Sequence, residues 1–457
     1  MNFYEETAKH LDERLGVGSN YGVIRKMLTV GEKREASLYF LQGFVKDNVT
    51  ERILEYCIKA PSANDCIFNL PYMEVQITSD KTEIEEAILY GESVLIVCGI
   101  ESAAIIDTRQ FPVRSIEEPE NDRVLRGPRD GFGESLVSNT VLIRRRIHDP
   151  ELTMQKFKVG EKTKCDVVIC YMNGTADKEL VGTVKSKIEK MKHRGSMNMV
   201  QESLAEALIH RGWYNPFPKV RYSERPDAVA SMVLEGAIAI LCDNTPQVMI
   251  VPTSIFDFLQ ESDDFYLPPL IGTYLRLTRM AIFMLALVLT PTWYLLLSYP
   301  NAIPGWLRFI MIAEPAKIPL LAQLLMAEFM IDGLKLASLN TPSMLNNSLS
   351  VVGGLILGDF AVQVGWFCPD VILYMSIVAI AAFTQQSYEL GYAFKFIRIL
   401  TLIATAIFGI YGYLGSMLLF IILIATNRTV GGRGYLYPLI PLDLKALALM
   451  FFRPRRK

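Results

Sequence analysis

The feature that most constrains this 457-residue chain is a predominantly apolar run of 20 residues, Met280–Tyr299. As a helix rising about 1.5 Å per residue, such a run is roughly 30 Å long, which matches the core of a lipid bilayer. Three more apolar stretches follow, at Ser348–Phe367, Val371–Thr384 and Phe396–Ala425, and the last forms either one long tilted span or two short ones. We therefore expect an all-α polytopic membrane domain of four to six spans.

The distribution of charge divides the chain at the same place. Residues 272–457 carry 14 basic and 7 acidic side chains, whereas residues 1–271 carry 32 basic and 41 acidic ones. An acidic half joined to a basic, apolar half is typical of a soluble domain followed by a membrane domain. This pattern excludes a purely cytosolic enzyme, a disordered protein and a nucleic-acid binder built on a basic surface. The seven cysteines show no paired spacing beyond Cys165 and Cys170, which excludes a disulfide scaffold.

The first half is expected to be an α/β domain of two lobes, because short apolar strands alternate with helices. Strands are predicted at 36–44, 73–77, 93–98, 101–107, 165–171, 237–241 and 247–251, and helices at 49–59, 81–90, 178–192, 199–210 and 225–235. The expected division is a first lobe at 1–112, a linker with a connecting helix at 113–150, a second lobe at 151–267 and the transmembrane domain at 268–457. We find no convincing internal repeat in the sequence.

The N-terminal domain is expected to be cytoplasmic, because residues 1–15 are charged and contain no apolar signal segment. Arg276 and Arg279 just before the first span, and the basic end at 453–457, place both of these points in the cytoplasm by the positive-inside rule. A short interfacial helix is predicted at 442–452.

Signals for catalysis are poor. The four histidines have no metal-ligand spacing, and Gly131-Phe132-Gly133 precedes a predicted helix without the strand that a dinucleotide fingerprint requires. We therefore expect no enzyme activity, no cofactor and no metal site. That helix is predicted at 131–147 with Asp130 as its N-cap.

Charged residues within apolar segments are the stronger functional signal. Glu328, Asp332 and Lys335 lie four and three positions apart, which puts them on one face of a helix at 318–339. Each of these charged side chains would cost about 2.5–3.5 kcal/mol on membrane insertion if it faced lipid. The face is therefore expected either to line a pore or hydrated vestibule, or to belong to an amphipathic interfacial helix, with Lys335 as the counter-charge in both cases.

Asp359 is the second intramembrane candidate, because it lies in an apolar segment flanked by glycines that allow close helix packing. It is interpreted either as a pore or ion-binding residue, or as a partner of Lys335 or Lys395 that fixes helix packing. The candidate ion path is therefore Glu328, Asp332, Lys335 and Asp359.

Two arginine clusters, Arg126 with Arg129 and Arg144–Arg146, flank the connecting helix. They are interpreted either as a site for anions or lipid head groups, or as ion-pair partners of the acidic lobes. The second interpretation is favoured because residues 1–271 carry a net negative charge.

The stretch 118–147, with Glu-Pro-Glu-Asn-Asp-Arg-Val-Leu-Arg-Gly-Pro-Arg-Asp-Gly-Phe at its start, resembles the signature of the A subunits of GerA-type spore germinant receptors. Val352–Gly358 is similar to the glycine-rich span of that family. The candidate signature and linker residues are Arg126, Gly127, Pro128, Arg129, Gly131, Phe132, Glu134, Asn139, Arg144, Arg145 and Arg146.

Within this family, residues 11–18, 383–391 and 437–443 are more similar to the stage V AF branch. Two positions depart from the family pattern, because Asp359 stands where Gln is usual and Gln385 where Pro is commoner. The resemblance implies an integral protein of the spore inner membrane that acts in germination.

It further implies a homo-oligomeric ion channel that releases monovalent cations and amplifies the signal of germinant receptors. The expected partners are further copies of the chain, other germination membrane proteins (receptors or a small membrane partner) and the lipid bilayer. No nucleic acid is expected. The alternatives are a nutrient-sensing receptor A subunit, a small-solute transporter and a non-conducting scaffold for germination proteins.

Overall fold

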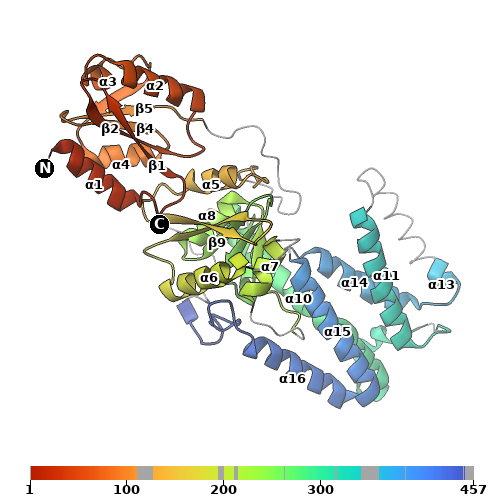
Figure 1. Ribbon diagram of the computed structural model, residues 1–457. Coiled ribbons are helices and arrows are strands. Elements are labelled where there is room, and N and C mark those ends of the chain that lie inside the picture. Colours follow the sequence, from red (N-terminus) through yellow and green to blue (C-terminus); the bar gives the residue numbers. More distant parts are fainter. Residues whose placement is uncertain are drawn as a thin grey trace. The chain divides into compact units, whose positions relative to one another are not determined.

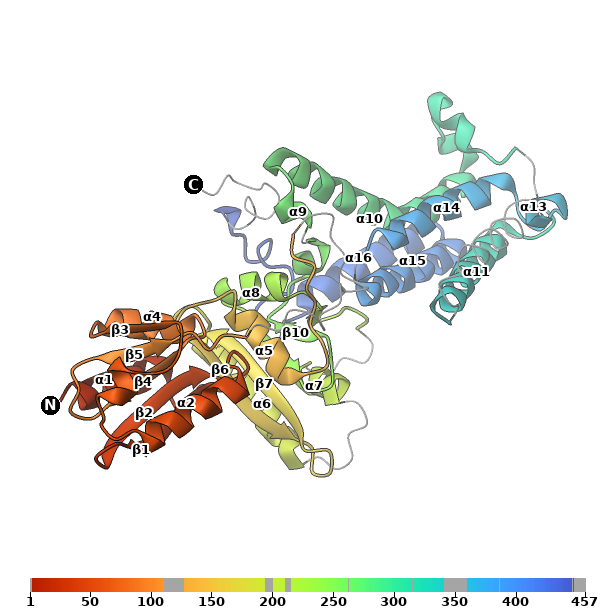
Figure 2. The same ribbon diagram turned by 90° about the horizontal axis from the view of Figure 1, so that it is seen from above.

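The computed structural model describes residues 2–110, 127–193, 200–209, 215–261, 263–313, 316–340, 360–385, 387–445 and 447 (Figures 1 and 2). The chain divides into two compact units. The first, the sheet unit, comprises Met1–Arg211, Lys219–Thr253 and Thr429–Gly432, and the second, the helical unit, comprises Gly212–Pro218, Ser254–Arg428 and Arg433–Lys457.

The first lobe of the sheet unit is a five-stranded sheet with helices on both faces. Its elements are α1 (Phe3–Leu15), β1 (Val23–Val30), β2 (Arg34–Leu41), α2 (Asp47–Lys59), α3 (Asp65–Phe68), β3 (Val75–Thr78), α4 (Lys81–Leu89), β4 (Ser93–Val97) and β5 (Ala103–Ile106). The strand order is β1-β2-β4-β5-β3, and all neighbours are antiparallel.

Two apolar layers hold this lobe together, because successive residues of a strand point to opposite faces of the sheet. In β2, Tyr39 and Leu41 pack with α1 and α4, whereas Ala36 and Leu38 pack with α2 and α3 (Figure 1). The central strands are therefore apolar on both faces, which is why the sequence predicted them. The edge strand β1 has a more polar pattern, with Met27 64% exposed, and was not predicted.

The second lobe repeats this architecture. Its elements are α5 (Leu136–Arg144), β6 (Leu152–Val159), β7 (Cys165–Met172), α6 (Lys178–Lys190), η1 (Met191–His193), α7 (Val200–Leu208), β8 (Arg221–Ser223), α8 (Pro226–Leu234), β9 (Ile238–Cys242) and β10 (Val248–Val251). The strand order β6-β7-β9-β10-β8 matches that of the first lobe, and its neighbours are also antiparallel. Helices α6 and α7 cover one face, and α5 and α8 the other. The two lobes share their strand order and not an evident residue pattern, so the sequence did not reveal the shared order.

Helix α5 begins later than the sequence predicted. Its N-cap is Ser135, whose hydroxyl accepts a hydrogen bond from the Ser138 amide, and not Asp130. Asp130 instead forms an ion pair with Arg146 at 2.6 Å. The residues between are held in a non-helical conformation, since the Phe132 amide donates to the carbonyl of Glu224.

A buried hydrogen-bond cluster joins the two lobes. The Asn20 side-chain amide donates to the carbonyls of Leu15 and Leu152, and its oxygen accepts from the Met154 amide and from Arg144. Arg144 also donates to the carbonyl of Tyr21. Burial lowers the pKa of the Arg144 guanidinium to about 10.

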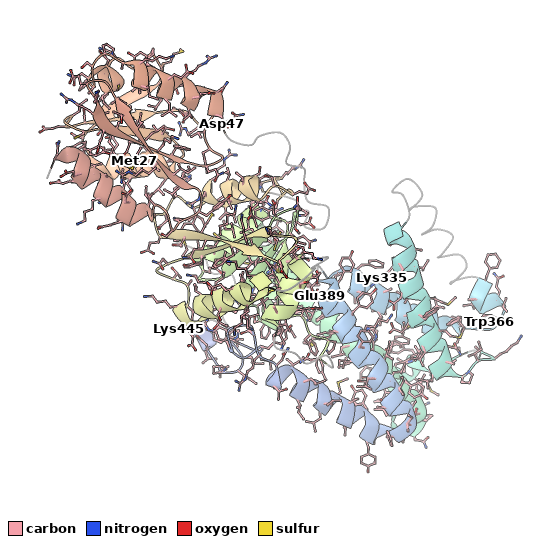
Figure 3. All side chains as sticks on the ribbon, viewed as in Figure 1. Met27, Asp47, Lys335, Trp366, Glu389 and Lys445 are labelled. Atoms are coloured by element: carbon pink, nitrogen blue, oxygen red, sulfur yellow. The ribbon has the colours of Figure 1, made fainter. Side chains whose placement is uncertain are left out.

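The helical unit contains η2 (Ile255–Leu259), α9 (Asp263–Tyr266), α10 (Pro269–Ser298), η3 (Pro300–Ala302), η4 (Gly305–Ile310), α11 (Leu320–Asn340), α13 (Ala361–Gln363), α14 (Pro369–Phe383), α15 (Tyr388–Phe408) and α16 (Ile410–Thr426). Among the described residues, α10 and α15 are long and apolar enough to cross a membrane, and α14 and α16 are apolar but shorter. Many of their large apolar side chains are exposed, as is Trp366 after α13 (Figure 3). Such a surface suits contact with lipid or with another protein.

The apolar stretch 396–425 forms two helices. The break is at Gly409, whose φ of 59° and ψ of −135° are accessible only to glycine without strain. The fold class predicted from the sequence, a two-lobed α/β domain followed by a helical domain, is confirmed. Most of the stretch 348–367 and most of the helix predicted at 442–452 lie outside the described residues.

Candidate functional site

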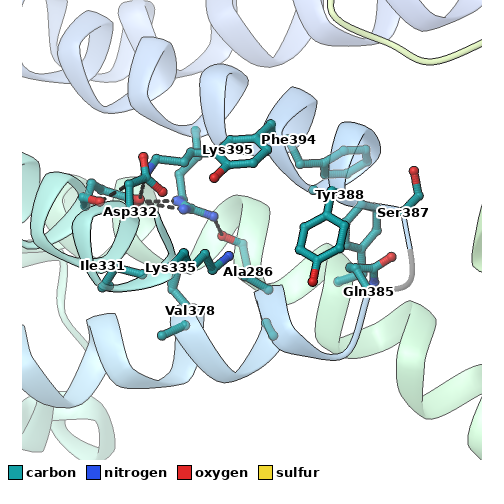
Figure 4. Close-up of a pocket in the computed structure, with 18 residues that line it drawn as sticks. Ala286, Ile331, Asp332, Lys335, Val378, Gln385, Ser387, Tyr388, Phe394 and Lys395 are labelled. Carbon is teal, nitrogen blue, oxygen red and sulfur yellow. Dashed lines mark hydrogen bonds and ion pairs between the residues drawn. The ribbon is translucent and has the colours of Figure 1, made fainter. Parts of the chain in front are cut away.

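The helical unit contains a cavity of about 40 Å³ bordered by α10, α11, α14 and α15 (Figure 4). This charged cavity is lined by Phe283, Ala286, Glu328, Ile331, Asp332, Lys335, Val378, Ala379, Ala381, Ala382, Gln385, Ser387, Tyr388, Gly391, Tyr392, Phe394, Lys395 and Arg398. The volume is sufficient for a few water molecules or a very small ligand. The acidic face predicted for α11 therefore meets protein at this cavity.

Glu328 is the most extensively paired residue of the cavity. Its side chain is 6% exposed, and its Oε1 lies 2.7 Å from both Nε and Nη2 of Arg398. Its Oε2 lies 3.3 Å from Nζ of Lys395, which also donates to the Glu328 carbonyl at 3.0 Å. Arg398 donates in addition to the carbonyl of Ala286 on α10 at 3.2 Å. These contacts connect α11, α15 and α10.

Asp332 shares a cation with Glu328. Its Oδ2 forms an ion pair with Lys395, while the carboxylate remains 28% exposed. The sequence predicted Lys335 as the counter-charge of both carboxylates. The structure instead supplies Lys395 and Arg398 from α15, because the packing of α15 against α11 brings them closer to the carboxylates.

Lys335 extends over two aromatic rings. Its ammonium lies 5.2 Å from the ring centre of Phe383 and 5.9 Å from that of Tyr392. Among the described residues, it has no ion pair or side-chain hydrogen bond. With all groups ionised, three cations face two carboxylates, so the cavity carries one net positive charge.

Gln385 closes the cavity between α14 and α15. It is only 8% exposed, yet neither its amide nitrogen nor its amide oxygen has a hydrogen-bond partner among the described residues. A buried amide without partners is costly, so such a group usually contacts water or a ligand. From the sequence, Gln385 stood out only as a departure from a family pattern.

Asp359, the remaining candidate for the ion path, lies outside the described residues, as does Arg126 of the signature. The described signature residues shape the chain before and along α5. Asn139 exchanges two hydrogen bonds with the backbone of Gly133, and the carbonyl of Pro128 accepts a hydrogen bond from the guanidinium of Arg225. The remaining described members are Gly127, Arg129, Gly131, Phe132, Glu134, Arg144, Arg145 and Arg146, all within the sheet unit. Within this cluster, Arg146 forms an ion pair with Asp130 of the expected linker, and Arg144 donates to Asn20 and Tyr21.

Phe217 is a buried aromatic residue of the helical unit to which no sequence signal pointed. This residue comes from the stretch between α7 and β8, but residues 212–218 belong to the helical unit. Its ring is 4% exposed and lies 6.1 Å from those of Phe394 on α15 and Phe420 on α16. The carbonyl of Pro218 accepts a hydrogen bond of 2.7 Å from the Tyr435 hydroxyl. Because Phe394 also lines the charged cavity, Phe217 contacts one of its walls from behind.

Comparison with known proteins decides the family. The model of the Bacillus/Clostridium GerA spore germination protein family matches residues 9–457. The chain belongs to the GerA family. It is 35% identical to stage V sporulation protein AF of Bacillus subtilis (strain 168), over 98% of this chain and 92% of that protein. The resemblance inferred from the sequence is therefore confirmed.

Two further likenesses are to a membrane protein and to a domain of a germinant receptor. The chain is 33% identical to the uncharacterized membrane protein YfkQ of Bacillus subtilis (strain 168), over 77% of this chain and 68% of that protein. The solved N-terminal domain of the A subunit of the Bacillus megaterium spore germinant receptor GerK3 is 22% identical, with a TM-score of 0.40, and the match covers 55% of this chain and 95% of that one. The family match makes this chain a GerA-family spore germination or sporulation membrane protein, in agreement with its two long apolar helices among the described residues. Among the described residues, no three metal-binding side chains are grouped as they would be around a metal ion.

Proposed function

We propose that this GerA protein is a subunit of an oligomeric channel that releases monovalent cations during germination and amplifies the signal of germinant receptors. The observation that supports this function most directly is the charged cavity inside the helical unit. Five ionised side chains from two helices surround a space bordered by four helices. Charged groups within apolar helices are costly, and they usually mark ion or substrate pathways.

The pairing pattern leads to a gating mechanism. In this conformation both carboxylates are bound by Lys395 and Arg398, so neither is available to a passing cation. Movement of α15 relative to α11 would separate these pairs and expose Glu328 and Asp332 to the path. Exposed carboxylates attract cations and repel anions, which gives selectivity by charge.

The segment carrying Phe217 is the proposed coupling element. It is continuous in sequence with the second lobe but packs inside the helical unit, on α15 and α16. A displacement of this segment would move Phe394, and with it the helix that carries Lys395 and Arg398. The second lobe would in this way influence the ion pairs of the cavity.

The proposed location is the spore inner membrane, with the N-terminal domain on the core side. The proposed partners are further copies of the chain, germinant receptors or a small membrane partner, and the bilayer. The basic residues that flank the predicted spans on the sequence support this orientation.

The test is potassium efflux from liposomes that contain the purified full-length protein. We expect efflux with wild-type protein, and lower efflux or weaker cation selectivity with Asp332→Asn and with Asp359→Asn. Asp370→Asn is the matched control, because Asp370 lies in the first turn of α14 and does not line the cavity. It should conduct as wild type does.

Two outcomes would contradict parts of the proposal. Unchanged selectivity in Asp332→Asn would remove the cavity from the ion path. The second test uses liposomes that also contain germinant receptors exposed to their nutrients. If these liposomes show no potassium efflux, the scaffold interpretation is favoured.

A further inference from the structure

The charged cavity has two groups whose interactions are incomplete, and they point to one kind of ligand. Lys335 has an ammonium without a carboxylate partner among the described residues, and Gln385 has a buried amide without hydrogen bonds to described residues. Both groups offer N–H donors.

The charge balance points to the same ligand chemistry. Both carboxylates are occupied by Lys395 and Arg398, which leaves one net positive charge in the cavity. The ammonium of Lys335 is half-buried, so a counter-ion within the cavity would stabilise it. A monovalent anion would neutralise the net charge, whereas a cation would double it.

The shape of the lining favours a carboxylate over a spherical anion. Lys335 and Gln385 come from different segments and both line the cavity, which suits a ligand with two acceptor oxygens. The part of the lining contributed by α14 is apolar and made of small side chains, Val378, Ala379, Ala381 and Ala382. This wall suits a methyl group or a short alkyl chain.

From these observations we infer that the cavity is a binding site for a short-chain carboxylate such as acetate. Lys335 and the Gln385 amide hold its oxygens, and the apolar wall of α14 receives its alkyl end. The site lies in the same cavity as the proposed cation path, in the conformation in which both carboxylates are paired, and its occupancy does not require that the protein conduct ions.

Binding is measured on the full-length protein in lipid nanodiscs, so that it does not depend on flux. Sodium acetate is titrated at constant ionic strength against sodium methanesulfonate while the midpoint of thermal unfolding is followed. We expect a saturable rise, because a ligand that binds only the folded state stabilises it. Sodium chloride, titrated in parallel, should give no comparable rise.

Variants test the two donors separately. Lys335→Met should weaken acetate binding about tenfold or more, as expected for loss of a charged hydrogen-bond donor, and Lys335→Arg should retain most of it. Gln385→Leu should weaken binding several-fold. The matched controls should bind as wild type does. They are Lys317→Met, an exposed lysine, and Asn427→Leu, a second buried amide without described partners that does not line the cavity.

Three results would overturn the inference. The first is no saturable rise with acetate, which would mean that the cavity holds only water. The second is saturation with chloride and not with acetate. The third is acetate binding that persists unchanged in both Lys335→Met and Gln385→Leu.

Discussion

The ion pairs of Glu328 make a strong prediction about the stability of the helical unit. At an effective dielectric constant of about 20, two unit charges about 4 Å apart attract each other by about 4 kcal/mol. Glu328 has two cationic partners, and all three side chains are at most 12% exposed. Removing one member of a buried pair typically costs about 3–5 kcal/mol, because the remaining charge is left without compensation.

The charge balance predicts which removal costs more. Glu328→Met leaves three cations facing Asp332 alone, two net positive charges, so we expect a loss near 5 kcal/mol. Arg398→Met leaves two cations and two carboxylates, and Lys395 still pairs with Glu328, so the loss should be nearer 3 kcal/mol. The double variant restores the net charge of wild type with apolar side chains in place of the pair. Its cost should be smaller than that of Glu328→Met alone.

The measurement is equilibrium unfolding of the purified protein in mixed detergent micelles, followed by circular dichroism. Arg308→Met is the control, because Arg308 is exposed and should contribute little. A double variant that loses as much stability as Glu328→Met alone, or more, would refute the reasoning, since removal of the counter-charge would then have relieved nothing.

Three further predictions concern the rest of the chain. Asn20→Ala should destabilise the sheet unit by about 1–3 kcal/mol, because it leaves a buried N–H donor of Arg144 and the amide of Met154 without their acceptor. The measurement is chemical denaturation, and an unchanged midpoint would contradict this role of Asn20. Gly409→Ala should lower the free energy of unfolding of the helical unit by about 1–3 kcal/mol, because the φ of Gly409 is 59° and an added Cβ would lie 2.8 Å from the Tyr299 hydroxyl. A variant as stable as wild type would show that this turn does not require glycine. Burial raises the pKa of the Cys57 thiol to about 12, so iodoacetamide at pH 8 should label Cys57 only after unfolding, as measured by peptide mass spectrometry. Rapid labelling of native protein would contradict its burial.

Much of the fold was predictable because it depends on local patterns. Strands such as β4 and β7 are apolar on both faces, since helices cover both sides of each sheet, and they were predicted close to their true bounds. The edge strands β1 and β6 were missed. Lys26 and Lys156 interrupt their apolar pattern, as is usual for edge strands that must avoid pairing with other chains.

The predicted start of helix α5 was wrong because a long-range hydrogen bond overrode the local preference of the residues. Asp130 is a good N-cap by residue type, but the Phe132 amide is bound by a carbonyl about 90 residues away in the chain, that of Glu224. The helix therefore starts after Ser135. The repeated strand order of the two lobes was also hidden, because topology does not require similar residues.

The sequence by itself determined that an α/β half precedes a helical half, and that Glu328, Asp332 and Lys335 share one helical face. Both conclusions follow from periodicity and composition, which are properties of neighbouring residues. Only the tertiary structure decided that the two carboxylates are paired with Lys395 and Arg398. It also decided that the ammonium of Lys335 lies above aromatic rings, and that Gln385 lines the same cavity. These relationships join residues up to 70 positions apart, and they depend on how α11, α14 and α15 pack, which no local pattern specifies.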